Sequence, residues 1–159
     1  MTKLNTVKKM LYVAAALSTS AFLSMQVAAN QTLAADLGTY PGSSLSAPAG
    51  KVSVSFDKET LSVKFNMNGI TPSSKGGIHI HTGTSCDDAS KVGGHYWSAT
   101  LGDDTWKTTT WESDSNGNAK GELMVKTGYN YAENLSHALV IHNTEGSRIA
   151  CGILVASAD

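Results

Sequence analysis

The chain has 159 residues, of which 41% are hydrophobic, with 12 basic and 13 acidic residues and a formal net charge of −1. This length is sufficient for one domain with a hydrophobic core. The absence of a basic excess argues against a protein that binds nucleic acids or anionic membranes through a strongly positive surface.

The first 29 residues have the pattern of a secretory signal peptide. Three lysines within residues 1–9 precede an apolar run over 10–23, which is short for a membrane span, and small residues at 27–29 offer a cleavage site. Removal of this segment takes away three lysines, which leaves 9 basic and 13 acidic residues and a net charge of −4. We therefore expect a secreted or periplasmic protein with no nucleic-acid or membrane partner.

The next segment, residues 30–49, is rich in Ala, Gly and Ser and has no clear periodicity. This composition predicts a flexible linker, so the folded domain is expected to span 50–159. Asn30 and Asn134 lie in Asn-X-Ser/Thr sequons, which are glycosylated only in a eukaryotic host.

Residues 50–159 have the pattern of a β-protein. Apolar and polar residues alternate over 52–56 and 61–67, which predicts a hairpin with one buried face. Further strands are expected at 77–81, 121–126, 137–142 and 148–155, with a long functional loop over 82–104. Since no segment has a sustained helical period, we expect an all-β fold: a Greek-key β-barrel or sandwich of about eight antiparallel strands, immunoglobulin-like in architecture.

The chain contains two cysteines, Cys86 and Cys151. In an exported protein an even pair indicates a disulfide. Closure of a loop of about 65 residues would stabilise the fold by about 4 kcal/mol. The alternative interpretation is two buried free thiols.

Five histidines are candidate metal ligands. His79 and His81 are two residues apart on a predicted strand, so their side chains lie on the same face, and neighbouring neutral imidazoles suit a metal ion. A histidine pair with no metal is the alternative. His137 and His142 are five residues apart, so on a regular strand they face opposite ways, and we expect His137 outside any site that contains His142.

Several motifs occur together in a specific order. They are Gly77-x-His79-x-His81, Cys86, Gly94-His95, Val140-Ile141-His142 and Gly146-Ser147-Arg148-Ile149-Ala150-Cys151-Gly152. With this set of motifs the chain resembles the copper/zinc superoxide dismutase family over about residues 50–156. The resemblance implies an eight-stranded Greek-key β-barrel, in agreement with the strand pattern.

The resemblance also implies roles for individual residues. His79, His81 and His142 look like the copper ligands, and His95 looks like the ligand that bridges copper to zinc in the family. Cys86 and Cys151 match the family's intrasubunit disulfide. Arg148 matches the arginine that receives the anionic substrate, superoxide, so Arg148 and His95 are the expected catalytic residues.

Two departures from the family pattern concern the metals. No histidine occurs between His95 and His137, so the zinc site is expected to be absent. Only five residues, 143–147, separate His142 from Arg148, where the family has a long charged loop. Both features resemble the copper-only branch of the family and predict one copper ion per chain.

Without zinc, another group should orient His95. Asp103, Asp104 or Glu112 could accept a hydrogen bond from its ring, but the sequence does not choose among them, and each can equally be a solvated loop carboxylate. Aromatic residues in the same region are expected either to wall the site or to form a packed cluster: Tyr96, Trp97, Trp106 and Trp111.

The function expected from these residues is copper-dependent dismutation of superoxide to dioxygen and hydrogen peroxide outside the cytoplasm. The main alternative is a non-catalytic copper-binding or copper-buffering module on the same fold. A structural β-sandwich with relic histidines and an inert zinc protein are further alternatives. We expect a monomer, with a homodimer left open.

Overall fold

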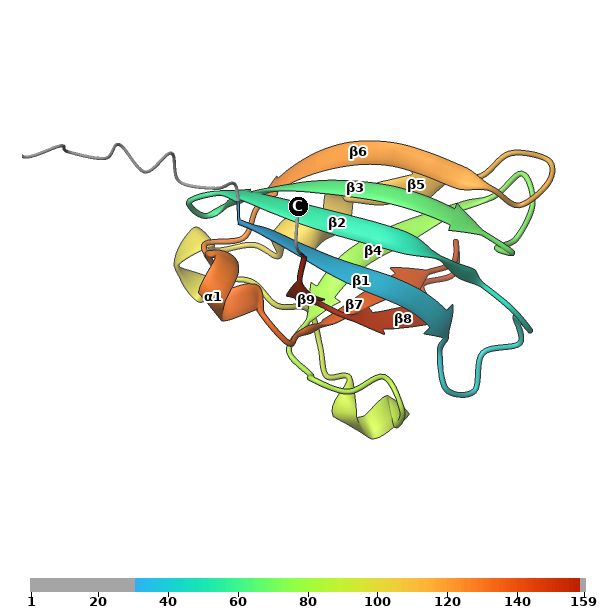
Figure 1. The fold of residues 1–159 in the computed structure, drawn as a ribbon, viewed down its shortest axis with the longest axis horizontal. Coiled ribbons are helices and arrows are strands. Elements are labelled where there is room, and N and C mark those ends of the chain that lie inside the picture. The colour runs from blue at the N-terminus through green and yellow to red at the C-terminus, as the bar shows by residue number, and fades with distance from the viewer. Residues whose placement is uncertain (1–30, 158–159) are drawn as a thin grey trace, which may run out of the picture.

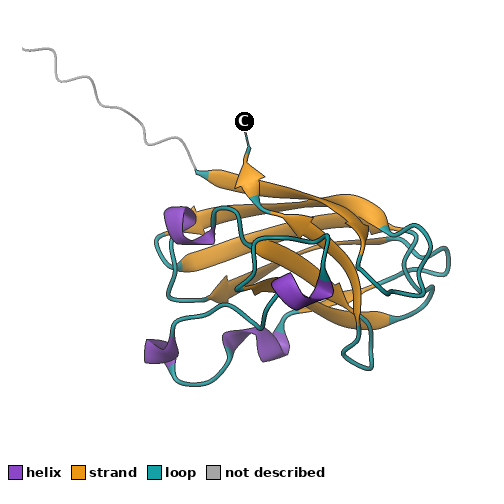
Figure 2. Ribbon diagram, turned by 90° about the horizontal axis from the view of Figure 1, so that it is seen from below, coloured by secondary structure: helices purple, strands orange, loops and turns teal. Residues whose placement is uncertain are grey.

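The computed structural model describes residues 31–157, so the predicted signal peptide (1–29) and the sequon at Asn30 lie outside the described residues. This part of the chain is mostly β-structure, with short helices in the segments that connect the strands (Figures 1 and 2). Its elements are β1 (Thr32–Thr39), β2 (Ala49–Asp57), β3 (Thr60–Asn68), β4 (Lys75–His81), η1 (Ala89–Lys91), η2 (Ala99–Leu101), η3 (Thr105–Thr108), β5 (Thr110–Glu112), β6 (Ala119–Lys126), α1 (Tyr131–Asn134), β7 (Ala138–His142), β8 (Arg148–Ile153) and β9 (Val155–Ala156).

The strands form one antiparallel, nearly closed barrel-like sheet. Their order is β5-β4-β7-β8-β1-β2-β3-β6, with β9 paired to β1. A turn that contains the hydrogen bond from Asp114 N–H to Asn118 O joins β5 to β6, the two ends of this order, and so brings the edges of the sheet together. β7 returns after β5 and β6 to lie beside β4, which is a Greek-key connection, and β8 follows β7 through a short turn and pairs with β1. The predicted all-β fold is confirmed.

Alternation decides which side chains enter the barrel. Every second residue of β3 is buried, from Leu61 to Met67, and the intervening residues are more exposed. β4 contributes Ile78 and Ile80 to the same hydrophobic core. A second, smaller cluster lies on the other side of β7 and contains Tyr40, Val92, Ala138, Val140 and Cys151. Both faces of β7 are therefore covered.

The prediction of a flexible linker at 30–49 is wrong. Residues Thr32–Thr39 form β1, which pairs with β2 on one side and with β8 and β9 on the other. Leu33, Ala35 and Leu37 lie on the same face of β1 and are buried in the core. The domain therefore begins at β1 and not at residue 50.

Smaller differences from the predicted strands occur near the C-terminus and in the middle of the chain. The expected strand 148–155 divides into β8 and β9 at Leu154, whose backbone bonds to residues 136 and 137. The short strand β5 follows the 82–104 loop and was not predicted. Asn134 is fully buried in α1 and its side-chain amide donates to Asn130 O at 2.8 Å, so this conformation leaves the second sequon inaccessible for glycosylation.

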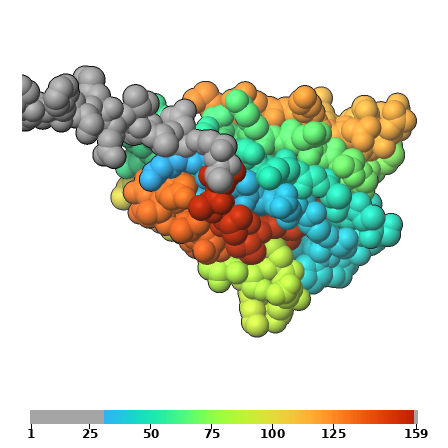
Figure 3. Space-filling view, in the orientation of Figure 1, coloured from blue at the N-terminus to red at the C-terminus, as the bar shows by residue number. Residues whose placement is uncertain are grey.

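The first part of the 82–104 loop projects from the barrel, as the yellow-green segment at the lower edge of Figure 3 shows. A disulfide between Cys86 and Cys151 attaches this loop to β8, with 5.8 Å between the two Cα atoms. The prediction of a disulfide is thus confirmed. Such a bond is typical of an oxidising, extracytoplasmic environment. Within residues 31–157, no helix is long and apolar enough to cross a membrane.

Replacing both cysteines by serine is expected to lower the free energy of unfolding by about 4 kcal/mol. The reason is that the disulfide closes a loop of 65 residues in the unfolded chain. Urea denaturation of the variant and of the reduced native protein measures the effect, and both should shift by the same amount. Equal stability of the oxidised and reduced native protein would contradict this account.

Candidate metal centre

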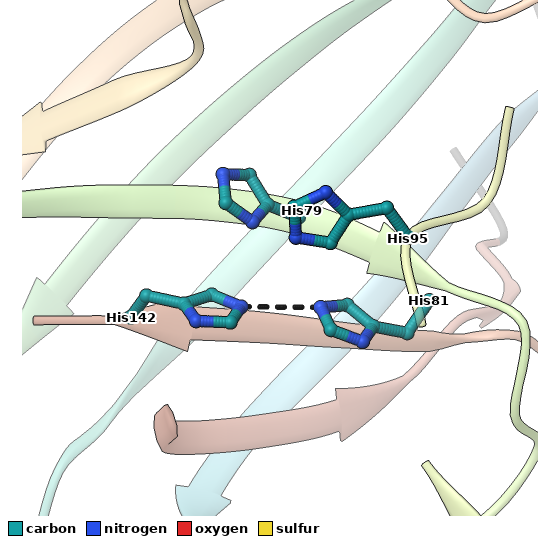
Figure 4. Close-up of side chains that lie close together, drawn as sticks. All are labelled: His79, His81, His95 and His142. Carbon is teal, nitrogen blue, oxygen red and sulfur yellow. Dashed lines mark hydrogen bonds between the residues drawn. The ribbon is translucent and has the colours of Figure 1, made fainter. Parts of the chain in front are cut away.

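Four histidines from three segments meet on the outer side of the barrel wall (Figure 4). His79 and His81 project from β4, His142 ends β7, and His95 comes from the 82–104 loop, where it forms an isolated bridge with His81. One nitrogen of each ring lies within 4.8 Å of the corresponding nitrogens of the others. The four residues predicted as metal ligands therefore lie together, close enough to bind a single metal ion.

Hydrogen bonds from Nδ1 orient three of the four rings. His81 Nδ1 lies 3.0 Å from Gly93 O, His142 Nδ1 lies 2.9 Å from Gly146 O, and His95 Nδ1 lies 2.7 Å from Asp104 Oδ2. A carbonyl or carboxylate oxygen only accepts, so Nδ1 carries the hydrogen in each ring. Nε2 is then left with a free lone pair, which is the state that a metal ligand needs.

The fourth ring, His79, is turned the other way. Its Nε2 edge packs over Gly77, where an added Cβ atom would lie only 2.5 Å from Nε2. Its Nδ1 is buried and has no hydrogen-bond partner within the described residues. A buried nitrogen without a partner is unfavourable unless another ligand satisfies it. His79 Nδ1 therefore fits a fourth metal-binding atom.

The buried histidines of the cluster favour the neutral, metal-binding form of the ring. Burial lowers the pKa of His79 and of His81 to about 3, and it also lowers the pKa of His142. His81 Nε2 and His142 Nε2 face each other at 3.1 Å, the contact dashed in Figure 4. With the hydrogen of each ring on Nδ1, two lone pairs meet there, and a bound cation would relieve their repulsion. The residues present fit a metal ion.

The choice of metal is limited by the chemistry of the ligands. Neutral imidazole nitrogens suit copper, zinc, iron and nickel, and a set of four nitrogens is a common environment of Cu(II). The donor set thus defines a single-metal centre of nitrogen ligands.

Of the three carboxylates considered for the orientation of His95, the structure selects Asp104. Its Oδ2 accepts from His95, and its Oδ1 accepts from Trp106 N–H at 2.9 Å, which caps η3. Partial burial tends to raise the pKa of this carboxyl, but the hydrogen bonds from His95 and Trp106 outweigh burial and lower it. Asp103 and Glu112 are exposed and make no hydrogen bond to His95.

Arg148, the other predicted site residue, starts β8 and is half-buried near His81 and His142, where its charge contributes to their lowered pKa values. Its guanidinium donates to Tyr40 Oη at 3.0 Å and to Gly93 O. Within residues 31–157 it forms no salt bridge. The positive charge is therefore fixed in place but not neutralised.

The aromatic residues were expected either to wall the site or to form a packed cluster, and the structure shows both arrangements. Trp106 and Trp111 are buried in the core, and both also touch the site. The centroids of the Trp106 and His79 rings lie 6.2 Å apart, and Trp111 Nε1 donates to His142 O at 3.0 Å. Tyr96 instead stacks on His137, at 4.0 Å between ring centroids, and on Tyr129.

His137 lies outside the metal cluster, as strand parity predicted. It precedes β7, and its Nδ1 lies 3.1 Å from the backbone oxygen of His81. Trp97 is half-buried against the hydrophobic core.

A cavity of about 490 Å³ opens onto the cluster. His79, His95 and His142 form part of its wall, and the exposed residues Lys75 and Lys107 lie at its rim. Small solutes can therefore approach the candidate metal centre from solvent.

No model of a known protein family and no curated protein sequence matches this chain.

Replacing Asp104 by asparagine is expected to weaken metal binding about 10- to 100-fold, the usual effect of altering a residue that orients a metal-binding histidine. Asparagine can still cap η3, so the fold should persist. Competition with a chromophoric chelator measures the affinity. Asp103→Asn is the matched control and should bind metal as the native protein does; equal affinity of all three proteins would contradict the role of Asp104.

The stability of the metal-free protein is expected to fall as the pH drops below 6.5. His79 and His81 have a pKa of about 3 in the folded state and about 6.5 when unfolded. Between these values the unfolded state binds more protons, and each residue contributes up to about 1.4 kcal/mol per pH unit. Urea midpoints from pH 7 to 4 measure the slope, which should be shallower in a His79→Gln, His81→Gln variant. An equal pH dependence of stability in the native protein and the variant would contradict the assignment of the lowered pKa values to His79 and His81.

Proposed function

We propose that this protein is an extracytoplasmic, copper-dependent superoxide dismutase that works without a zinc site. One observation carries the proposal. The four histidines of the dismutase-like motifs converge on one point, beside an arginine whose charge has no acidic partner among the described residues. The order of the motifs supports copper, and the arginine supports an anionic substrate.

Each ligand has a defined part in this proposal. His81, His95 and His142 would hold the metal through Nε2 and His79 through Nδ1. Bound copper supplies reversible one-electron chemistry, by which one superoxide is oxidised to dioxygen and a second takes up one electron and two protons to become hydrogen peroxide. The protein's own contribution is to hold four neutral nitrogens and to keep the site open to a small solute.

His95 is the proposed proton carrier. It is the most exposed of the four histidines, and its Nδ1–H is engaged by Asp104 at 2.7 Å. When it does not hold the metal, His95 Nε2 would be free to take up a proton, and the positive ring would then lie against the Asp104 carboxylate, which is a favourable arrangement. Asp104 thus supports His95 where the family relies on zinc.

Arg148 is the proposed anion-binding residue. Its fixed guanidinium offers a positive charge near His81 and His142. In a mature chain with an expected net charge of −4, such a local positive charge favours the encounter with superoxide. A copper-buffering protein has no evident use for this charge, and this is the reason for preferring the enzyme.

The test is the rate of superoxide decay on addition of the purified, disulfide-bonded protein loaded with one equivalent of copper. We expect fast catalytic decay that is lost in His142→Ala and reduced at least about tenfold in Arg148→Ala, with copper still bound in the latter. His137→Ala is the matched histidine control and should retain full activity.

Free copper with chelator, the metal-free protein and the zinc-loaded protein complete the comparison. If the protein binds copper tightly but accelerates decay no more than these controls, the enzyme proposal fails and the copper-buffering alternative stands. If Arg148→Ala retains full activity, the proposed substrate role of the arginine fails.

A further inference from the structure

The guanidinium of Arg148 is held on two sides by neutral acceptors. Nη1 donates to Tyr40 Oη at 3.0 Å, Nη2 donates to Gly93 O, and the guanidinium carbon lies 5.7 Å from the centroid of the Tyr40 ring. A carboxylate in either place would neutralise the charge. A hydroxyl, a carbonyl and an aromatic face orient it and leave the charge available to an anion.

One of these acceptors is shared with the metal cluster. Gly93 O accepts both from Arg148 and from His81 Nδ1. The backbone of Gly93 has a φ of +74°, a conformation that glycine adopts at little cost. The carbonyl therefore sets the position of the guanidinium relative to a candidate metal ligand, but it holds only one of the two terminal nitrogens.

The second nitrogen depends on Tyr40, and the structure leaves the Tyr40 hydroxyl little freedom. The ring is 7% exposed and packs with Val92, Ala138, Val140 and Cys151. Its backbone N–H donates to Ile149 O at 3.2 Å, and its hydroxyl can donate to Ala89 O at 3.4 Å. With its hydrogen directed to Ala89, the hydroxyl oxygen presents a lone pair to Arg148.

We infer that Tyr40 is a positioning residue that fixes the guanidinium of Arg148 in its anion-binding orientation beside the histidine cluster. Arginine has a long side chain with considerable rotamer freedom. With one terminal nitrogen tethered only to Gly93, the group could rotate about that contact toward solvent; the Tyr40 hydroxyl prevents the rotation. The inference rests on the proposed function, because it specifies how the substrate-binding charge of that site is held.

Tyr40 could instead serve only the packing of its hydrophobic cluster. Tyr40→Phe separates the two roles, since it keeps the buried ring and removes the hydroxyl. Tyr131→Phe is the matched control, because the Tyr131 ring packs against Phe56 on another side of the barrel. Thermal unfolding of both variants checks that the fold is retained.

The first measurement is the rate at which Arg148 is chemically modified in the metal-free protein. Arg148 is the only arginine in the chain, so an arginine reagent reports on this residue alone. Phenylglyoxal modifies arginine side chains, so mass spectrometry of the adduct reports on this one residue. Loss of the Tyr40 hydroxyl should raise the modification rate about three- to tenfold, the factor that corresponds to one hydrogen bond. Tyr131→Phe should react at the native rate.

The second measurement is the affinity of the copper-loaded protein for azide, a small monovalent anion, followed by absorption spectroscopy. Tyr40→Phe should weaken azide binding by a similar three- to tenfold factor. In an Arg148→Gln background the same change should have no further effect, because the hydroxyl acts only through the guanidinium.

The outcomes separate this inference from the function on which it rests. Unchanged phenylglyoxal and azide results for Tyr40→Phe would overturn the inference, even if Arg148→Gln weakens azide binding and superoxide decay as proposed. An equal loss from Tyr40→Phe in the native and Arg148→Gln backgrounds would also overturn it, since the effect would not pass through Arg148. An unchanged azide affinity in Arg148→Gln would instead reject the substrate role of the arginine.

Discussion

The alternation of side chains along β4 is the constraint on which the candidate metal centre depends. Because successive residues of a strand point to opposite faces, Ile78 and Ile80 enter the barrel core while His79 and His81 are directed outward. The core thus anchors the strand that carries the two histidines, while their side chains lie on its other face. β7 adds His142 beside them through its pairing with β4.

An outward-facing histidine is normally solvated, yet His79, His81 and His142 are buried. The covering comes in part from the 82–104 loop, which supplies His95, Gly93 and Asp104 to the same region. The disulfide to Cys151 attaches this loop to β8. Burial explains the lowered pKa values of His79, His81 and His142. The fold therefore keeps these rings neutral before any cation binds.

Charge is arranged differently on the two sides of this neutral cluster. Asp104 lies behind His95, and the positively charged Arg148 lies near His81 and His142. The carboxylate is engaged by the imidazole and by the cap of η3, whereas the guanidinium contacts only neutral acceptors among the described residues. A negative charge that supports a ligand and a positive charge left for an anion are what the proposed chemistry requires.

The sequence alone determined the features that depend on local order. Period-two alternation identified the hairpin of β2 and β3, the shared face of His79 and His81, and the exclusion of His137. The even cysteine count indicated the disulfide. Motif order brought His95 and His142 into the same predicted site. The predictions from alternation and from the cysteine count succeed because strand geometry and the reactivity of thiols need little information about distant parts of the chain. The joint placement of His95 and His142 instead followed from the resemblance of the motifs.

Tertiary structure decided what depends on contacts between distant segments. β1 was missed because Leu33, Ala35 and Leu37 lie in a stretch rich in small residues, and its pairing with three other strands and its burial in the core depend on distant segments. Asp103 and Asp104 are equivalent candidates in the sequence, and the path of the 82–104 loop places Asp104 against His95. Tyr40 meets Arg148 across 108 residues, a contact that no local pattern announces. Side-chain chemistry proposes candidates, but the packing of the barrel determines which of them meet.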